Sequence, residues 1–214
     1  VEDESIAAGG AANVALNVKA LGGIVECLGS FGNDEKGKEL IALLSSSGVV
    51  VDAKCIVEGS ATISKTRVMA SNQQICRVDR EETPENYNPN LSDLGEVIEQ
   101  KAASADVVIV SDYGKGFVTS ELVALLRTQS SFLAIDPKPS RLLDYKSPDL
   151  FTPNRIEALE IAGFSRFYNG EFPTEVVIRR IFESFGPSKL AITLGSKGML
   201  LAEDGKYVDL IPTA

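Results

Sequence analysis

Residues 106–136 read DVVIVSDYGKGFVTSELVALLRTQSSFLAID. The stretch opens with the apolar run DVVIV and closes with a second extended run, SFLAID. Between them, residues 120–127 show helical spacing of apolar side chains, and Thr119 stands where a helix cap is expected. Two parallel strands need a long, usually helical, connection, so this stretch predicts a strand-helix-strand unit.

The same alternation extends in both directions from this unit. Helical patterns recur upstream and downstream, each followed by an apolar run. We expect helices over residues 91–104, 154–162 and 174–185, strands over residues 149–152 and 189–194, and a hairpin that turns at Asp204 and Gly205. The order predicts an α/β fold with a mostly parallel sheet covered by helices on both faces.

The first third of the chain has a different character. We expect a helix over residues 11–21, a buried strand over residues 24–32, and a helix over residues 35–47 capped by Asp34. Three extended runs follow, VVVDAKCIV, ATISKTRVMA and QQICRVDR, with turn residues between them. These runs predict a small antiparallel sheet within residues 49–81.

Composition limits the functions open to the chain. Its 214 residues carry a formal net charge of -9, which argues against binding nucleic acid or an anionic membrane, and its sequence has no apolar run long enough for a membrane span. The absence of histidine excludes Ser-His-Asp and Cys-His catalysis and most imidazole metal sites. Three widely spaced cysteines predict buried, reduced thiols and a cytoplasmic location, and the first ten residues do not resemble a signal peptide.

Four predicted strands end in polar residues or glycines, in the segments SDYGKG, DPK, PNRIE and GSKG. The carboxyl ends of parallel strands meet at one edge of a sheet, where ligands bind. Each segment also has a structural interpretation. Asn154 and Glu157 match a helix capping box, and LGSKG matches a tight turn. Asp112 and Lys115 fit a capped turn, and arginines on strands are mostly solvated. Neither a P-loop nor a well-placed dinucleotide-binding motif is found.

Several segments together resemble one family. GGAANVALNVKALGG (residues 9–23) and CLGSFGNDEKG (residues 27–37) are similar to the N-terminal signature of ribokinase-like, PfkB-type carbohydrate kinases. The segments TRVMASNQQICRVDREE, VVIVSDYGKG, IDPK, FTPNRIE and TLGSKGM resemble, in order and spacing, the branch that phosphorylates D-glycero-D-manno-heptose 7-phosphate. That branch serves ADP-heptose and lipopolysaccharide core synthesis, and its kinase is often fused to an adenylyltransferase, which this sequence does not show.

The resemblance implies a ribokinase-like three-layer α/β/α sandwich over residues 1–214, with residues 49–81 as a lid. It implies sugar contacts from Gly9, Gly10, Asn13, Arg67, Gln74, Arg77, Asp112 and Lys115. It implies ATP contacts from Lys138, Asn154, Arg155, Ile156, Glu157, Thr193, Gly195 and Gly198, with Asn154 and Glu157 ordering magnesium. The implied reaction is in-line transfer of the γ-phosphoryl group of ATP to the anomeric hydroxyl. A homodimer through the lid is a further implication.

The sequence also departs from this family. The G-D-x-x-x-D segment that grips the sugar and the G-A-G-D segment that carries the catalytic base have no counterpart in it, so we assign no catalytic residue. We therefore expect the sequence to be a piece of a longer kinase. Two alternatives stay open at this point: a kinase of another sugar or of a nucleoside, and a non-catalytic sugar-binding protein without the base.

Overall fold

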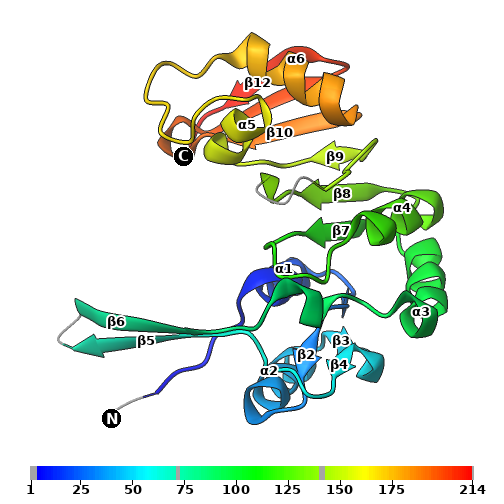
Figure 1. The fold of residues 1–214 in the computed structure, drawn as a ribbon. Helices are drawn as coiled ribbons and strands as arrows, with labels where there is room; N and C mark the ends of the chain where they lie inside the picture. The colour runs from blue at the N-terminus through cyan, green and yellow to red at the C-terminus, as the bar shows by residue number, and fades with distance from the viewer. Residues whose placement is uncertain (1–3, 71–72, 140–142, 214) are drawn as a thin grey trace. The chain divides into compact units, whose positions relative to one another are not determined.

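The computed structural model describes residues 4–70, 73–139 and 143–213 (Figure 1). The chain divides into two compact units. Unit 1 comprises Val1–Leu94 and Lys115–Phe117, and unit 2 comprises Gly95–Gly114 and Val118–Ala214. The assignment of residues 1–214 to one kinase domain with a lid stays a prediction.

Unit 1 contains two helices beside very short strands. Helix α1 spans Gly10–Ala20 and α2 spans Glu35–Ser46, both close to the predicted bounds. Asp34 caps α2 as expected, because its side chain accepts a hydrogen bond from the backbone N–H of Gly37 at 2.9 Å. The core of the unit forms around these helices, from the buried residues Ala12, Ala15, Cys27, Phe31, Leu44, Val49 and Cys55.

The strand prediction for residues 24–32 was only partly right. Two two-residue strands replace the single buried strand, β1 (Glu26–Cys27) and β2 (Phe31–Gly32). Their partners are β3 (Val50–Val51) and β4 (Ile56–Val57), each paired in parallel. Gly29 and Ser30 lie between β1 and β2, and the 3-10 turn η1 (Ala53–Cys55) lies between β3 and β4.

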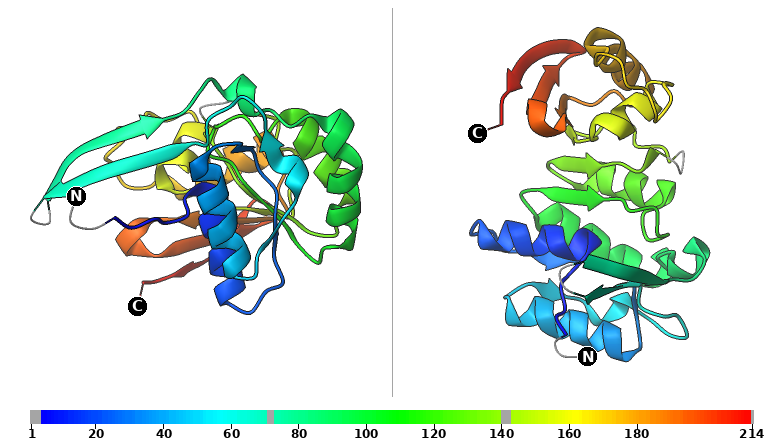
Figure 2. Two further views of the ribbon diagram at one scale, coloured as in Figure 1. Left: turned by 90° about the horizontal axis from the view of Figure 1, so that it is seen from below. Right: turned by 90° about the vertical axis from the view of Figure 1, so that its left-hand side faces the viewer.

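The predicted three-stranded antiparallel sheet was also wrong in its first strand. The side chain of Asp52 accepts a hydrogen bond from the N–H of Lys54 at 2.9 Å, which starts η1 and interrupts the run. The other two runs form an antiparallel hairpin, β5 (Ser64–Ala70) and β6 (Gln73–Arg80). Figures 1 and 2 show this hairpin as a two-stranded arm, after which the turn η2 (Pro84–Tyr87) packs in unit 1.

Unit 2 is built on a six-stranded sheet in the order β12-β11-β10-β9-β8-β7. Strands β7 (Val108–Ser111), β8 (Leu133–Asp136), β9 (Leu150–Phe151) and β10 (Lys189–Thr193) run parallel. Strands β11 (Met199–Glu203) and β12 (Lys206–Ile211) add an antiparallel hairpin, which turns where expected. The mostly parallel sheet is therefore confirmed.

The helices of unit 2 follow the sequence pattern closely. They are α3 (Leu91–Ser104, which begins in unit 1), α4 (Ser120–Gln129), α5 (Arg155–Ile161) and α6 (Thr174–Phe185). Helix α6 ends at Gly186, whose φ of 57° is left-handed. Strand residues such as Ile135, Phe151 and Ile192 are fully buried, as are Val177 and Ile181 of α6. Each such side chain contributes about 1.5–3 kcal/mol by leaving water.

The cysteine prediction holds for two of the three thiols. Cys27 and Cys55 are buried thiols, whereas Cys76 is exposed on β6. Cys76 is exposed because the hairpin that carries it has no buried face. Burial, with a smaller contribution from Cys55, raises the pKa of Cys27 to about 11, so that thiol stays protonated. Among the helices described, none is long and apolar enough to cross a membrane.

Candidate functional site

The start of α1 carries three of the predicted sugar contacts. Gly9 is the N-cap residue and Gly10 has a left-handed φ of 55°. A Cβ atom placed on Gly9 would meet no atom within 4 Å, so packing in this structure does not require glycine there. Asn13 is exposed one turn further along the helix. The arrangement places open backbone beside an exposed amide side chain, which suits the approach of a hydroxylated ligand.

The β5–β6 hairpin brings the predicted cationic residues together in unit 1. Arg67 and Arg77 are directly opposite each other in the register, and Gln74 pairs with Met69 beyond a bulge. The guanidinium of Arg77 donates to Asp79 at 2.8 and 3.0 Å. Two like charges at opposed positions destabilise a two-stranded sheet; Asp79 offsets part of that cost through Arg77, and a bound anion would relieve the rest. The register therefore supports an anion site on this hairpin.

Lys115 lies at the base of the same hairpin, where it forms an ion pair with Glu81. The next residue, Gly116, has a φ of 108°, and a Cβ there would lie 1.9 Å from the carbonyl oxygen of Pro84. Gly116 is thus required by close backbone packing. An incoming phosphate would have to compete with Glu81 for the amine of Lys115.

In unit 2, the strand ends meet as predicted. The N–H of Asp112 donates to the carbonyl of Asp136 at 2.9 Å, and Asn154 forms a parallel bridge with Thr193. These contacts bring the ends of β7, β8, β9 and β10 to one edge of the sheet.

Asn154 and Glu157 form the capping box that the sequence allowed. The side-chain oxygen of Asn154 accepts from the N–H groups of Ile156 at 2.9 Å and Glu157 at 3.0 Å. In return, Oε2 of Glu157 accepts from the N–H of Asn154 at 3.0 Å. The side-chain oxygen of Asn154 and Oε2 of Glu157 therefore both stabilise the start of α5. The other carboxylate oxygen of Glu157 is left facing Lys138, whose Nζ lies 3.5 Å from it.

Asp136 adds a second carboxylate at this edge. Burial is the main cause that raises its pKa to about 6, and the charges of Glu157 and Asp112 act in the same direction, against Lys138. Burial disfavours the charged form of this carboxylate, and a cation bound beside it would offset that cost. This edge therefore favours a cation beside Asp136 and Glu157.

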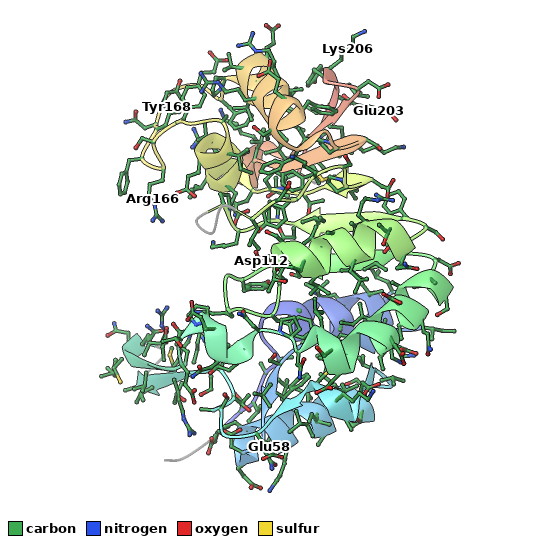
Figure 3. All side chains as sticks on the ribbon, turned by 45° about the vertical axis from the view of Figure 1, so that its right-hand side comes forward. Glu58, Asp112, Arg166, Tyr168, Glu203 and Lys206 are labelled. Atoms are coloured by element: carbon green, nitrogen blue, oxygen red, sulfur yellow. The ribbon has the colours of Figure 1, made fainter. Side chains whose placement is uncertain are left out.

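Asp112, labelled in Figure 3, is buried, and both of its carboxylate oxygens are bonded within the protein. Oδ1 accepts from the N–H of Gly114 at 2.7 Å, and Oδ2 accepts from the hydroxyl of Tyr145 at 2.5 Å. The carboxylate thus shapes the turn after β7 and, in this structure, does not extend toward a ligand.

The two predicted nucleotide glycines differ in their surroundings. A Cβ on Gly198 would lie 1.9 Å from the carbonyl oxygen of Ile211, at a φ of 98°, so the turn itself requires glycine. A Cβ on Gly195 would meet nothing within 4 Å, although its φ of 63° is left-handed. Gly195 therefore presents open backbone at the start of the 3-10 turn η4 (Gly195–Lys197).

Arg155 and Ile156 begin α5, and their predicted contacts with ATP stay a prediction. The guanidinium of Arg155 donates to the carbonyls of Tyr168 at 3.3 Å and Gly170 at 3.2 Å, and so supports the loop after α5. The side chain of Ile156 is 44% exposed. Its apolar surface suits packing against a base or ribose better than contact with phosphate.

Comparison with known proteins gives the family. The model of the pfkB family carbohydrate kinases matches residues 2–213. This chain belongs to the pfkB family. It is 34% identical over 202 residues to the bifunctional protein HldE of Desulfatibacillum aliphaticivorans, and 36% identical over 219 residues to that of Geobacter sulfurreducens. These alignments cover 92% and 100% of the chain but 41% and 44% of the relatives, so the chain spans less than half their length.

Solved structures show the pfkB fold directly. The chain is similar to ribokinase from Giardia lamblia, with a TM-score of 0.72, 19% identity, and coverage of 100% of this chain and 69% of the other. It is also similar to the tetrameric inhibited form of phosphofructokinase-2 from Escherichia coli, with a TM-score of 0.71, 20% identity, and coverage of 94% and 66%. The ribokinase-like fold prediction is therefore confirmed.

The strand-end residues fit ATP, which a carbohydrate kinase uses, together with a divalent metal ion. Magnesium binds one or two protein carboxylates together with substrate phosphates and water, and Glu157 offers one carboxylate oxygen outside the capping box. Within the described residues, no group of three or more Asp, Glu, Cys or His side chains could hold a metal alone. The donor set therefore suits a metal that arrives with a nucleotide.

Sequence reasoning missed three contributors to these sites: Asp136, Tyr145 and Glu81. Asp136 stood in the quoted DPK segment, and its place at a strand end was a usable signal. Tyr145 and Glu81 gave no such signal, because their roles depend on contacts across 33 and 34 residues of sequence.

Proposed function

We propose that this protein transfers the γ-phosphoryl group of ATP to the anomeric hydroxyl of D-glycero-D-manno-heptose 7-phosphate, a step toward ADP-heptose and the lipopolysaccharide core. Membership of the pfkB family supports a carbohydrate kinase. Relatives that are 34–36% identical over almost the whole chain, each named bifunctional protein HldE, support the heptose branch. Because ATP is the proposed donor, we propose the cytoplasm as the compartment.

The opposed pair Arg67 and Arg77 is the observation that carries the choice of a phosphorylated sugar. Both side chains belong to exposed strand positions, in a protein with a net charge of -9. The 7-phosphate would bind Arg67 and compete with Asp79 for Arg77, whereas an unphosphorylated sugar would bring no anion to the pair. We therefore assign the 7-phosphate to Arg67 and Arg77, with Gln74 beside them and Lys115 as a further cation, and the polyol to Gly9, Gly10 and Asn13.

At the nucleotide end, the proposed roles follow the geometry of unit 2. Bound magnesium and ATP supply the electrophilic phosphorus and neutralise charge that develops during transfer. Glu157 would hold the metal with the carboxylate oxygen that now faces Lys138, and Lys138, whose Nζ lies 3.5 Å from that oxygen, would contact the phosphates. Gly195 offers open backbone beside Thr193. No residue of this sequence is assigned as the base.

The test is a kinetic comparison of substrates and variants with the complete product of the gene that encodes this chain. Initial rates are measured with heptose 7-phosphate, fructose 6-phosphate, ribose and adenosine. We expect turnover only of the heptose phosphate. Arg67→Ala and Arg77→Ala should each raise its KM by roughly 10-fold or more, the effect of losing one charge-assisted hydrogen bond, with a smaller change in kcat.

The matched control is Arg166→Ala, which removes an exposed arginine from unit 2 that lies over the ring of Phe167. It should leave both constants unchanged. Faster turnover of a neutral sugar or of adenosine would show a different kinase. Sugar binding without transfer would show a non-catalytic binding protein.

We also propose a homodimer through the β5–β6 hairpin. Val68, Met69, Ile75 and Val78 are between 46% and 64% exposed there, and an isolated two-stranded hairpin is at best marginally stable. A second copy would cover these side chains. Val78→Asp should then convert a dimer to a monomer in sedimentation equilibrium, whereas a wild-type monomer at high concentration would refute the proposal.

A further inference from the structure

Tyr145 lies between β8 and β9 and is 1% exposed. Its ring packs against Phe151, with centroids 6.0 Å apart, and against Phe185, with centroids 5.8 Å apart. Phe151 and Phe185 also contact each other at 5.3 Å. A phenylalanine would serve this aromatic cluster equally well, so packing does not explain the hydroxyl group.

The hydroxyl of Tyr145 joins two turns at the strand ends of unit 2. It donates a hydrogen bond to Oδ2 of Asp112 at 2.5 Å and accepts one from the backbone N–H of Lys138 at 3.2 Å. The other oxygen of Asp112 accepts from the N–H of Gly114 at 2.7 Å. One buried oxygen atom therefore holds the turn after β7 to the turn after β8.

The hydroxyl of Tyr145 helps to determine where the side chain of Lys138 lies. Its backbone is fixed by Tyr145, while its amine lies 3.5 Å from Glu157, which the capping box holds in turn. Without the hydroxyl, the N–H of Lys138 and the carboxylate of Asp112 would both lose a partner in a largely buried place. Unpaired groups of this kind drive local rearrangement.

We propose that Tyr145 is a positioning residue of the kinase site: its hydroxyl fixes the turns that carry Asp112 and Lys138, and so sets where the amine of Lys138 meets the nucleotide phosphates. This inference rests on the proposed function for the identity of the ligand. The network of hydrogen bonds does not depend on that function, and the two can be tested separately.

The test variant is Tyr145→Phe in the complete gene product, because it keeps the ring and removes only the hydroxyl. Its matched control is Tyr87→Phe in unit 1. Tyr87 is also 1% exposed, and its hydroxyl also donates one bond, to the Ala61 carbonyl at 2.7 Å, and accepts one, from the Glu82 N–H at 3.1 Å. Both variants should lose similar stability.

Two measurements then separate positioning from simple destabilisation. Amide hydrogen exchange at Lys138 and Gly114 should become faster in Tyr145→Phe and stay unchanged in Tyr87→Phe. Calorimetric titration with magnesium-ATP should show roughly fivefold weaker binding in Tyr145→Phe alone, the effect of about one hydrogen bond. In a Lys138→Ala background, Tyr145→Phe should add little, because it acts through Lys138.

Each result decides the inference. Faster exchange with non-additive weakening of ATP binding supports it. Unchanged ATP affinity in Tyr145→Phe, or full additivity with Lys138→Ala, overturns the positioning role while leaving the kinase proposal intact. If the wild-type protein binds no magnesium-ATP, the proposed function fails and the positioning role fails with it, whatever the exchange rates show.

Discussion

Replacing Asn154 by alanine tests whether this residue acts through the helix cap. Its side-chain oxygen accepts two N–H groups, at 2.9 and 3.0 Å, at the start of the seven-residue helix α5. Losing an N-cap side chain costs about 1–2 kcal/mol, and so short a helix has little stability of its own. For a chain of 214 residues this corresponds to a fall in Tm of about 2–8 °C.

The same variant should also weaken magnesium-ATP binding, because fraying at the start of α5 would loosen the hydrogen bond from the backbone N–H of residue 154 to Glu157. Asn154→Ser is the informative partner, since serine caps a helix about as well as asparagine but has a shorter side chain. We expect it to restore both the Tm, followed by circular dichroism, and most of the ATP affinity, followed by calorimetry. The reasoning is refuted if Asn154→Ser melts like wild type yet binds ATP as poorly as Asn154→Ala.

Three further predictions test other parts of the structure. Gly198→Ala should destabilise the protein by more than about 2 kcal/mol in urea unfolding, since its Cβ would lie 1.9 Å from a carbonyl oxygen. Gly195→Ala should cost only about 1 kcal/mol, because only its left-handed φ opposes a side chain. Equal losses of stability in the two variants would contradict this prediction. The folded-state pKa of Asp136, about 6, exceeds the ordinary 3.8, so the free energy of unfolding should fall as pH rises from 3.8 to about 6. Asp136→Asn should reduce that fall by about 1 kcal/mol after allowance for solvent screening. An unchanged pH profile in this variant would count against the prediction. The carboxylate of Asp34 accepts hydrogen bonds from the N–H groups of Gly37 and Thr62. Asp34→Ala should therefore lower the free energy of unfolding by about 2 kcal/mol, as measured by chemical denaturation. A loss below about 0.5 kcal/mol would show that the cap is dispensable.

Elements whose signals are local could be predicted from the sequence to within about two residues. Helix α6 ends at Gly186, and α2 starts after Asp34, because a left-handed glycine and a capping carboxylate act on their immediate neighbours. The short strands of unit 1 could not be predicted in this way. Strand β1 pairs with β3 across more than twenty residues, and the Asp52 turn that interrupts the run VVVDAKCIV competes with strand formation.

In the candidate site, too, features that depend on local signals could be predicted and those that depend on tertiary contacts could not. Placing residues at the strand ends was possible, because a parallel sheet aligns its carboxyl ends whatever the details of packing. The direction of each side chain was not predictable. The carboxylate of Asp112 is hydrogen-bonded to Gly114 and Tyr145, and the guanidinium of Arg155 to the loop after α5. Buried polar groups bond to whichever partners the tertiary structure brings near.

The most direct test of the central claim is phosphorus NMR of the complete gene product with magnesium-ATP and D-glycero-D-manno-heptose 7-phosphate. We predict a new anomeric phosphate resonance that grows as ATP is consumed, while the 7-phosphate resonance persists. ATP left intact, or phosphate released to water without a new sugar phosphate, would contradict the assignment of this chain to heptose phosphorylation.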